Sequence, residues 1–101
     1  MPSRLGEEIV ALEAEDHYLR VHTMLGSDLV LMRLSDAIAG MEPDLGLQVH
    51  RSWWVAQDAI CEIVRSEQRS HLKLRNGLVA PVGRTYSAAV RARTGRLPLG
   101  D

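Results

Sequence analysis

Four histidines, one cysteine and thirteen carboxylates are the residues of this 101-residue chain that could bind a metal or take part in catalysis. Their spacing supports neither role, because zinc sites and metalloproteases need paired cysteines or histidines at offsets that this sequence lacks. His17 and His22 are five residues apart, so on one continuous strand they would face opposite sides. Cys61 lies among apolar residues without a nearby histidine, which predicts a buried, inert thiol. We therefore expect solvated histidines, no metal, no cofactor and no enzymatic activity.

Basic residues are concentrated in the C-terminal half of the chain, although the net charge is only −1. Residues 1–48 contain three arginines against nine acidic residues, whereas residues 49–101 contain nine basic residues against four acidic ones. Such an asymmetry allows one face of a nearly neutral protein to attract phosphate groups. His71, Lys73 and Arg75 alternate along one side of a predicted strand, which is typical either of phosphate contacts or of an edge strand protected by charge.

Two adjacent tryptophans, Trp53 and Trp54, follow His50-Arg51-Ser52. Neighbouring residues of a strand face opposite sides, so one indole belongs in the core and the other is a surface plug or a contact residue. The acidic run at 13–16 has no neighbouring proton acceptor and is interpreted as a solvated turn.

These residues are expected to lie on short strands or on the turns between them. Short apolar segments predict strands at 8–14, 18–24, 29–33, 59–65, 71–75 and 78–80. The strands at 18–24 and 71–75 alternate between apolar and polar residues, whereas the strand at 8–14 is largely apolar on both faces. Gly26-Ser27 predicts the turn of one hairpin, and Asn76-Gly77 predicts a type I′ turn in a second hairpin. This pattern indicates a mainly β fold with one or two short helices.

Two short helices complete the expected elements. Ser35 is expected to cap a helix of about two turns over 35–41, with Asp36 in its first turn. A second helix over part of 85–92 is expected to bury Tyr86, Ala89 and Val90.

The length allows a single domain, residues 1–101, and the residues after Gly95 are expected to fray. No apolar run is long enough for a bilayer span or a signal peptide. A lone cysteine fits a reducing compartment, so we expect a cytoplasmic protein.

Three motifs together resemble the LytTR family, the DNA-binding output module of many bacterial response regulators. They are LEAEDHYLRVHT at 12–23, VHRSWWV at 49–55 and PVGRTY at 81–86, in the order and spacing of that family. The resemblance covers about residues 7–93. It implies about ten short strands in stacked antiparallel sheets, with a short helix after the third strand. At position 83 this chain has glycine where the family often has serine.

The resemblance also implies that loops between strands, rather than a recognition helix, enter successive major grooves of double-stranded DNA, commonly at paired direct repeats. The base-contacting positions of the family correspond here to His17, Arg51 and Arg84. These residue types suit that role, because arginine and histidine can donate to guanine O6 or N7. The residues expected to contact backbone phosphates are His50, Ser52, Lys73 and Arg75.

The expected partners follow from this interpretation. They are double-stranded DNA, an upstream receiver or membrane-sensor domain outside this chain, and a second copy of the chain on DNA; this domain itself is expected to make no membrane contact. The expected function is sequence-specific regulation of bacterial transcription.

The alternative is a small β-rich module that binds a protein through Trp54 and the 71–80 hairpin, without nucleic acid. A steep salt dependence of DNA binding would separate the two.

Overall fold

A five-stranded sheet forms one layer of the computed structural model, which describes residues 9–66, 69–94 and 99–100. The strand order in this sheet is β3-β2-β1-β5-β4, and all neighbours are antiparallel. The five strands are β1 (Ile9–Glu15), β2 (Tyr18–Thr23), β3 (Gly26–Val30), β4 (Gly46–His50) and β5 (Trp53–Ala56). Most of the termini that were predicted to fray lie outside the described residues.

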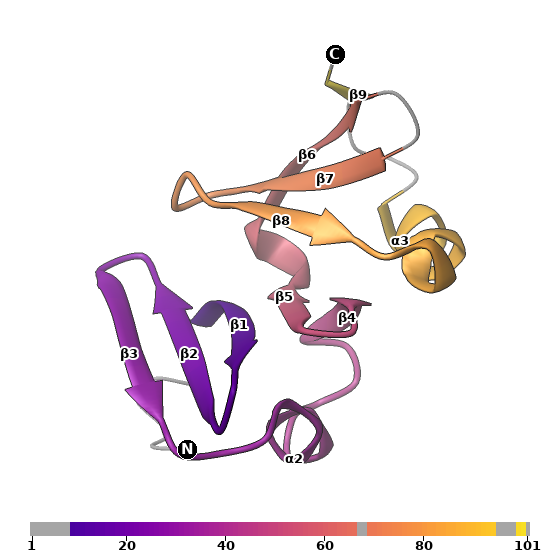
Figure 1. The fold of residues 1–101 in the computed structure, drawn as a ribbon. Coiled ribbons are helices and arrows are strands. Elements are labelled where there is room, and N and C mark those ends of the chain that lie inside the picture. The colour runs from indigo at the N-terminus through magenta and orange to yellow at the C-terminus, as the bar shows by residue number, and fades with distance from the viewer. Residues whose placement is uncertain (1–8, 67–68, 95–98, 101) are drawn as a thin grey trace.

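A second sheet, of order β8-β7-β6-β9, lies above the first in the view of Figure 1. Its strands are β6 (Ile60–Ser66), β7 (Arg69–Leu74), β8 (Val79–Val82) and β9 (Leu99–Gly100). The 3-10 turn η1 (Gln57–Ala59) connects the sheets. Pro81 is tolerated in β8 because this strand is at the edge of its sheet.

Two short helices flank the sheets. Helix α2 (Leu34–Ala39) follows the third strand, and α3 (Ser87–Thr94) follows the 3-10 turn η2 (Arg84–Tyr86). In Figure 1, α2 lies at the bottom of the molecule and α3 lies beside the end of β8. The predicted mainly β fold, with stacked sheets and a helix after the third strand, is confirmed.

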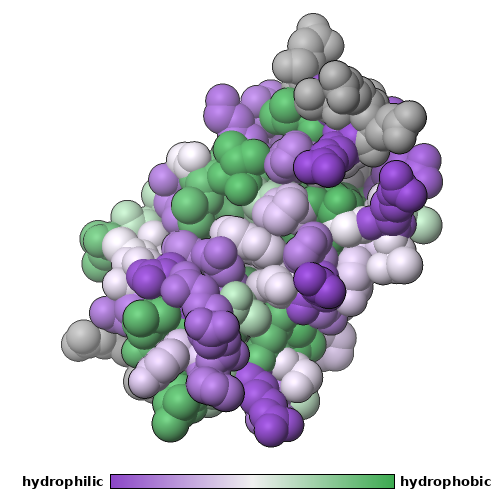
Figure 2. Space-filling model, in the orientation of Figure 1, coloured by the Kyte–Doolittle hydropathy of each residue, from purple (hydrophilic) through white to green (hydrophobic). Residues whose placement is uncertain are grey.

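The core is made of aliphatic side chains from both sheets. Leu12, Leu19 and Val55 of the first sheet and Leu72 and Ala80 of the second are completely inaccessible to solvent. Burial of a leucine or valine side chain contributes about 1.5–3 kcal/mol each, so this shared cluster is what joins the layers. Figure 2 shows the outer surface, where hydrophobic residues form patches separated by hydrophilic ones.

The turn between β2 and β3 lies two residues before the predicted position. Thr23 pairs with Gly26, which leaves Met24 and Leu25 as the turn. The Thr23 hydroxyl accepts a hydrogen bond from the Leu25 amide (3.1 Å) and donates one to the Gly26 carbonyl (3.2 Å). These side-chain bonds close the turn, so the third strand covers 26–30 instead of 29–33.

The turn of the β7–β8 hairpin is not of type I′. Lys73 pairs with Val79, and the Leu74 amide donates to the Leu78 carbonyl at 2.8 Å, which leaves a three-residue loop. A type I′ turn requires positive φ at Asn76, but in this loop only Gly77 has it, with a φ of 89°. The Asn76 side chain instead accepts a hydrogen bond from the Leu78 amide.

The helices differ from prediction in their caps and buried faces. Helix α2 begins at Leu34, one residue before the predicted cap Ser35, and its N-cap has no side-chain hydrogen bond. In α3, Val90 is buried as predicted, but Ala89 is exposed. The buried face is formed by Val90 and Thr94, which are one helical turn apart.

The prediction of a buried Cys61 is wrong, because its thiol is exposed. The register between β6 and β7 shifts between Ile60 and Glu62, as in a β-bulge. This irregularity lets Ile60 and Ile63 both face the core although they are three residues apart, and it turns Cys61 outward. The strand β4 is also absent from the predicted elements.

Candidate nucleic-acid interface

Three connecting segments that carry predicted base-contacting residues are tied together by backbone hydrogen bonds. The Ala14 amide donates to the Ser52 carbonyl at 2.8 Å, which joins the end of β1 to the β4–β5 turn. The Gly83 amide donates to the Val49 carbonyl at 2.8 Å, which joins the segment after β8 to β4. We refer to residues 16–17, 51–52 and 83–84 as the loop surface. Its three exposed basic side chains are His17, Arg51 and Arg84.

The β1–β2 turn presents His17 through an unusual backbone conformation. Glu15 pairs with Tyr18, so only Asp16 and His17 form the turn. Asp16 has a φ of 55°, a left-handed conformation that aspartate tolerates better than most residues because its short side chain can bond locally.

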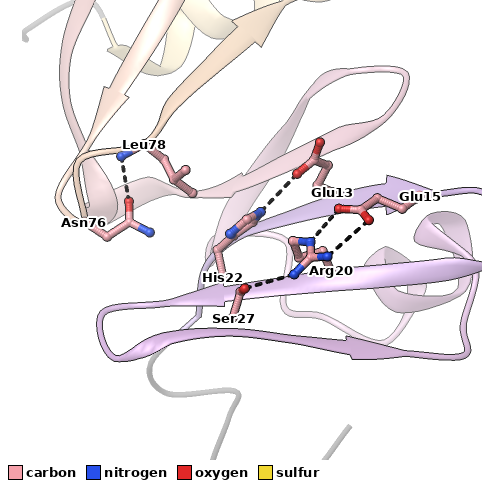
Figure 3. Close-up of polar contacts among 7 residues, drawn as sticks. All are labelled: Glu13, Glu15, Arg20, His22, Ser27, Asn76 and Leu78. Atoms are coloured by element: carbon pink, nitrogen blue, oxygen red, sulfur yellow. Dashed lines mark hydrogen bonds and ion pairs between the residues drawn. The ribbon is translucent and has the colours of Figure 1, made fainter.

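An ion pair supports this turn. The guanidinium group of Arg20 donates to both carboxylate oxygens of Glu15 and also to the Ser27 hydroxyl, as Figure 3 shows. These hydrogen bonds favour the ionised carboxylate and hold the pKa of Glu15 below its ordinary value. The acidic run at 13–16 is therefore not simply a solvated turn, because Glu15 has a specific partner.

His22 is buried, contrary to the predicted solvated histidines. Only 8% of the residue is exposed, and its Nε2 atom lies 3.1 Å from Oε1 of Glu13 (Figure 3). The ring stacks on Trp53 with a centroid distance of 5.7 Å and nearly parallel planes. Trp53 follows the turn that carries Arg51, so this stack packs that end of β5 across β1 against the far end of β2, away from His17.

The two tryptophans divide as the sequence predicted. Trp54 is the core residue, with 2% of its surface exposed, and Trp53 is half-buried on the opposite face. A Cβ atom on Gly46 would lie 2.4 Å from the Trp54 ring, so glycine is required there for the indole to fit. A protein-binding module that uses Trp54 as a contact is incompatible with this burial.

The β4–β5 turn orients His50 and leaves Arg51 at its tip. The Ser52 amide donates to Nδ1 of His50 at 3.1 Å. A neutral imidazole that accepts at Nδ1 carries its proton at Nε2, which leaves a donor for a ligand. His50 and Ser52 are both half-buried beside the exposed Arg51.

Arg84 begins η2, a turn fixed by local hydrogen bonds. The Tyr86 amide donates to the Gly83 carbonyl at 2.9 Å, and the Ser87 hydroxyl donates to the Arg84 carbonyl at 3.0 Å. A Cβ atom on Gly83 would lie 3.1 Å from the Tyr86 ring and 3.6 Å from Cα of His50. The Tyr86 ring therefore packs beneath the backbone that presents Arg84.

Lys73 and Arg75 are not part of the loop surface. The Lys73 ammonium group lies 3.6 Å from a carboxylate oxygen of Glu62, so it already has a counter-ion. Arg75 shares a cleft with Met24 and Leu25 of the β2–β3 turn. That turn is at the opposite end of the β1–β2 hairpin from His17.

Sequence reasoning missed a group of arginines beside Arg84. Arg69 at the start of β7 lines two adjoining clefts together with Arg84, and Arg91 of α3 lines one of them. These three residues have no common periodicity, so only the folded chain brings them together. Their position is adjacent to His50, which lines the second cleft.

Within the described ranges, no cluster of three or more histidine, cysteine or acidic side chains is arranged to hold a metal ion. In the same part of the chain, no helix has the length and apolar character needed to cross a bilayer.

Comparisons with known proteins agree with the resemblance in the sequence. The model of the LytTr DNA-binding domain family matches residues 6–95. The chain is 32% identical over 85 residues to the CO-responsive transcriptional regulator RcoM of Rhodospirillum rubrum, and the match covers 82% of this chain but 36% of that protein. The fold is similar to that of a LytTr DNA-binding domain from Bacillus cereus, with a TM-score of 0.78, 23% identity, and coverage of 88% of this chain and 83% of that one.

Proposed function

The chain belongs to the LytTr DNA-binding domain family, and on this premise we propose that its loop surface binds double-stranded DNA sequence-specifically to regulate bacterial transcription. In this proposal Arg51 and Arg84 donate to guanine O6 and N7 in the major groove, and His17 contacts a further base. The main support for the proposal is a pair of backbone hydrogen bonds, donated by the amides of Ala14 and Gly83. They fix the positions of the three segments of the loop surface relative to one another.

Contacts with the phosphates of the DNA backbone would determine the position of the domain on the duplex. His50, through Nε2, and Ser52 are the proposed phosphate contacts next to the bases. Lys73 and Arg75 are distant from the loop surface, so in this proposal they contact phosphates on a neighbouring stretch of the duplex. Lys73 would exchange its ion pair with Glu62 for that contact.

The chain spans 36% of the length of the curated relative it matches, so regulation by a further segment is part of the proposal. We propose that a receiver or sensor domain outside this chain controls DNA binding in the bacterial cytoplasm. We also propose binding of two copies to paired direct repeats. Footprinting on a selected duplex would show one or two protected segments and so distinguish the stoichiometries.

The test of the function is selection of duplexes from a random library, followed by binding measurements over a range of salt. We expect an enriched sequence to bind more tightly than a duplex of mixed sequence. The logarithm of the affinity should fall linearly with the logarithm of the salt concentration, because phosphate contacts release counter-ions from the DNA. No enrichment, together with no binding to any duplex at low salt, would contradict the proposal and favour a protein-binding module.

A further inference from the structure

Four arginines from four elements line one cleft at the end of the second sheet. They are Arg65 of β6, Arg69 of β7, Arg84 of η2 and Arg91 of α3. The cleft has a volume of about 260 Å³, and Ser70 and Ser87 add hydroxyl groups to its lining. Its lining comes from β6, β7, β8, η2 and α3, and Figure 1 shows the end of β8 leading toward α3.

Among the residues that the structure describes, the lining of this cleft carries positive charge without negative charge to balance it. All four guanidinium groups are on exposed residues, and no described aspartate or glutamate lines the cleft. None of the three ion pairs between described residues involves these arginines. Like charges that converge in this way repel one another, so an anion that enters the cleft is attracted by several groups at once.

The chemistry of the lining selects phosphate as the anion. Arginine presents its donors in a planar fork that matches two oxygens of a phosphate group. Hydroxyl groups such as those of Ser70 and Ser87 are the other common side-chain donors to phosphate oxygens.

The cleft is continuous with the proposed DNA interface. Arg69 and Arg84 also line a second cleft, which His50 shares. Arg84 therefore belongs both to the loop surface and to the lining of the first cleft. A duplex whose major groove receives Arg84 would pass its flanking backbone over Arg69 and Arg91.

We propose that Arg69 and Arg91 bind a phosphate of the DNA backbone next to the base pairs read by Arg84 and the rest of the loop surface. This inference rests on the proposed function, because it takes its phosphate from the duplex that the loops read. It assigns backbone positioning to the start of β7 and to α3, in addition to the residues expected from the sequence.

The test compares Arg69→Gln and Arg91→Gln with Arg93→Gln in the whole chain. Arg93 is on the same helix as Arg91, but it donates to Gln57 at 3.1 Å and does not line the cleft. We expect each cleft variant to weaken binding to a selected duplex and to a mixed-sequence duplex by the same factor. Each should also lower the log–log salt slope by about one. Arg93→Gln should leave the slope unchanged, and thermal unfolding should show that all three variants are folded.

Several outcomes separate this inference from the function on which it rests. If the unsubstituted chain binds no duplex, both fail. If Arg51→Ala and Arg84→Ala weaken specific binding but Arg69→Gln and Arg91→Gln behave like Arg93→Gln, only the cleft assignment is overturned.

Inorganic phosphate distinguishes the source of the anion. Side-chain NMR signals of Arg69 and Arg91 should respond weakly to phosphate, and the duplex should displace it. Saturation by phosphate that the duplex does not reverse would overturn the DNA assignment and indicate a site for a free phosphate ligand.

Discussion

The backbone amide of Gly83 donates a hydrogen bond to the carbonyl of Val49, with an N···O distance of 2.8 Å. Val49 belongs to the five-stranded sheet, and Gly83 follows the edge strand of the second sheet. This single bond therefore connects two layers at the point where both carry residues of the proposed interface. It holds Arg84 in a defined position relative to the turn that presents Arg51.

Gly83→Pro tests this connection. The φ of −73° at Gly83 suits proline, but the ring replaces the donor hydrogen and occupies the space where Val49 accepts. We expect the free energy of unfolding to fall by about 1–3 kcal/mol and specific DNA binding to weaken, because the two segments must separate. Chemical denaturation and fluorescence anisotropy measure the two effects. Gly83→Ala keeps the amide and is the control; equal DNA affinity of the two variants would contradict this role of the bond.

Arg51→Ala and Arg84→Ala test the division of base contacts. Each is expected to cost about 1–3 kcal/mol of binding free energy on the selected duplex. Because the two residues come from separate segments of the loop surface, each variant should relax the preference at a different base position. Repeating the duplex selection with each variant measures this. Loss of preference at the same position in both would show that the two arginines do not read separate bases.

Gly46→Ala tests the packing of the buried tryptophan. The added Cβ would lie 2.2 Å from the Val55 carbonyl oxygen and 2.4 Å from the Trp54 ring. The Val55 oxygen is a backbone atom, so it cannot move freely to make room. We expect a loss of about 3 kcal/mol in the free energy of unfolding, at the upper end of overpacking effects. Gly40→Ala is the matched control, since its nearest neighbours would be 3.7 Å away. A nearly neutral Gly46→Ala would mean that the chain repacks around Trp54.

Glu13→Ala tests the buried histidine. The substitution leaves the His22 ring, on a residue that is only 8% exposed, without its hydrogen-bond partner. An unsatisfied buried polar group costs about 1–3 kcal/mol, which chemical denaturation would detect. The control is Glu62→Ala, which removes an ion pair with the exposed Lys73 and should cost less than about 1 kcal/mol. Equal effects of the two substitutions would argue against a structural role for the Glu13–His22 contact.

The strands were predictable from the sequence because their signals are local. Alternation identified β2 and β7, an apolar run identified β1, and the cap at Ser35 identified the helix after the third strand. The β2–β3 turn was predicted wrongly from Gly26-Ser27. The hydrogen bonds of the Thr23 hydroxyl close the turn at Met24 and Leu25, and the glycine signal does not indicate them. Cys61 was assigned to the wrong environment for a similar reason, since a shift in strand register is set by the partner strand.

The candidate site was predictable only where a motif existed. His17, Arg51 and Arg84 belong to motifs that can be recognised along the chain. Arg69 and Arg91 belong to none, and they meet Arg84 only because β7, η2 and α3 converge. The burial of His22 depends likewise on β5, which supplies Trp53 from the other side of β1.

The Glu15–Arg20 pair makes a prediction about acid stability. Hydrogen bonding by Arg20 lowers the pKa of Glu15 in the folded protein from the ordinary value of 4.5. The ionised carboxylate is therefore favoured by folding, so the pair stabilises the protein above the unfolded pKa, and this contribution is lost as the pH falls through the folded pKa. An NMR titration of the Glu15 carboxyl carbon should give a midpoint below 4.5. Arg20→Gln should return the midpoint toward that value and flatten the acid limb of the stability curve; an unchanged midpoint in this variant would show that Arg20 is not the cause.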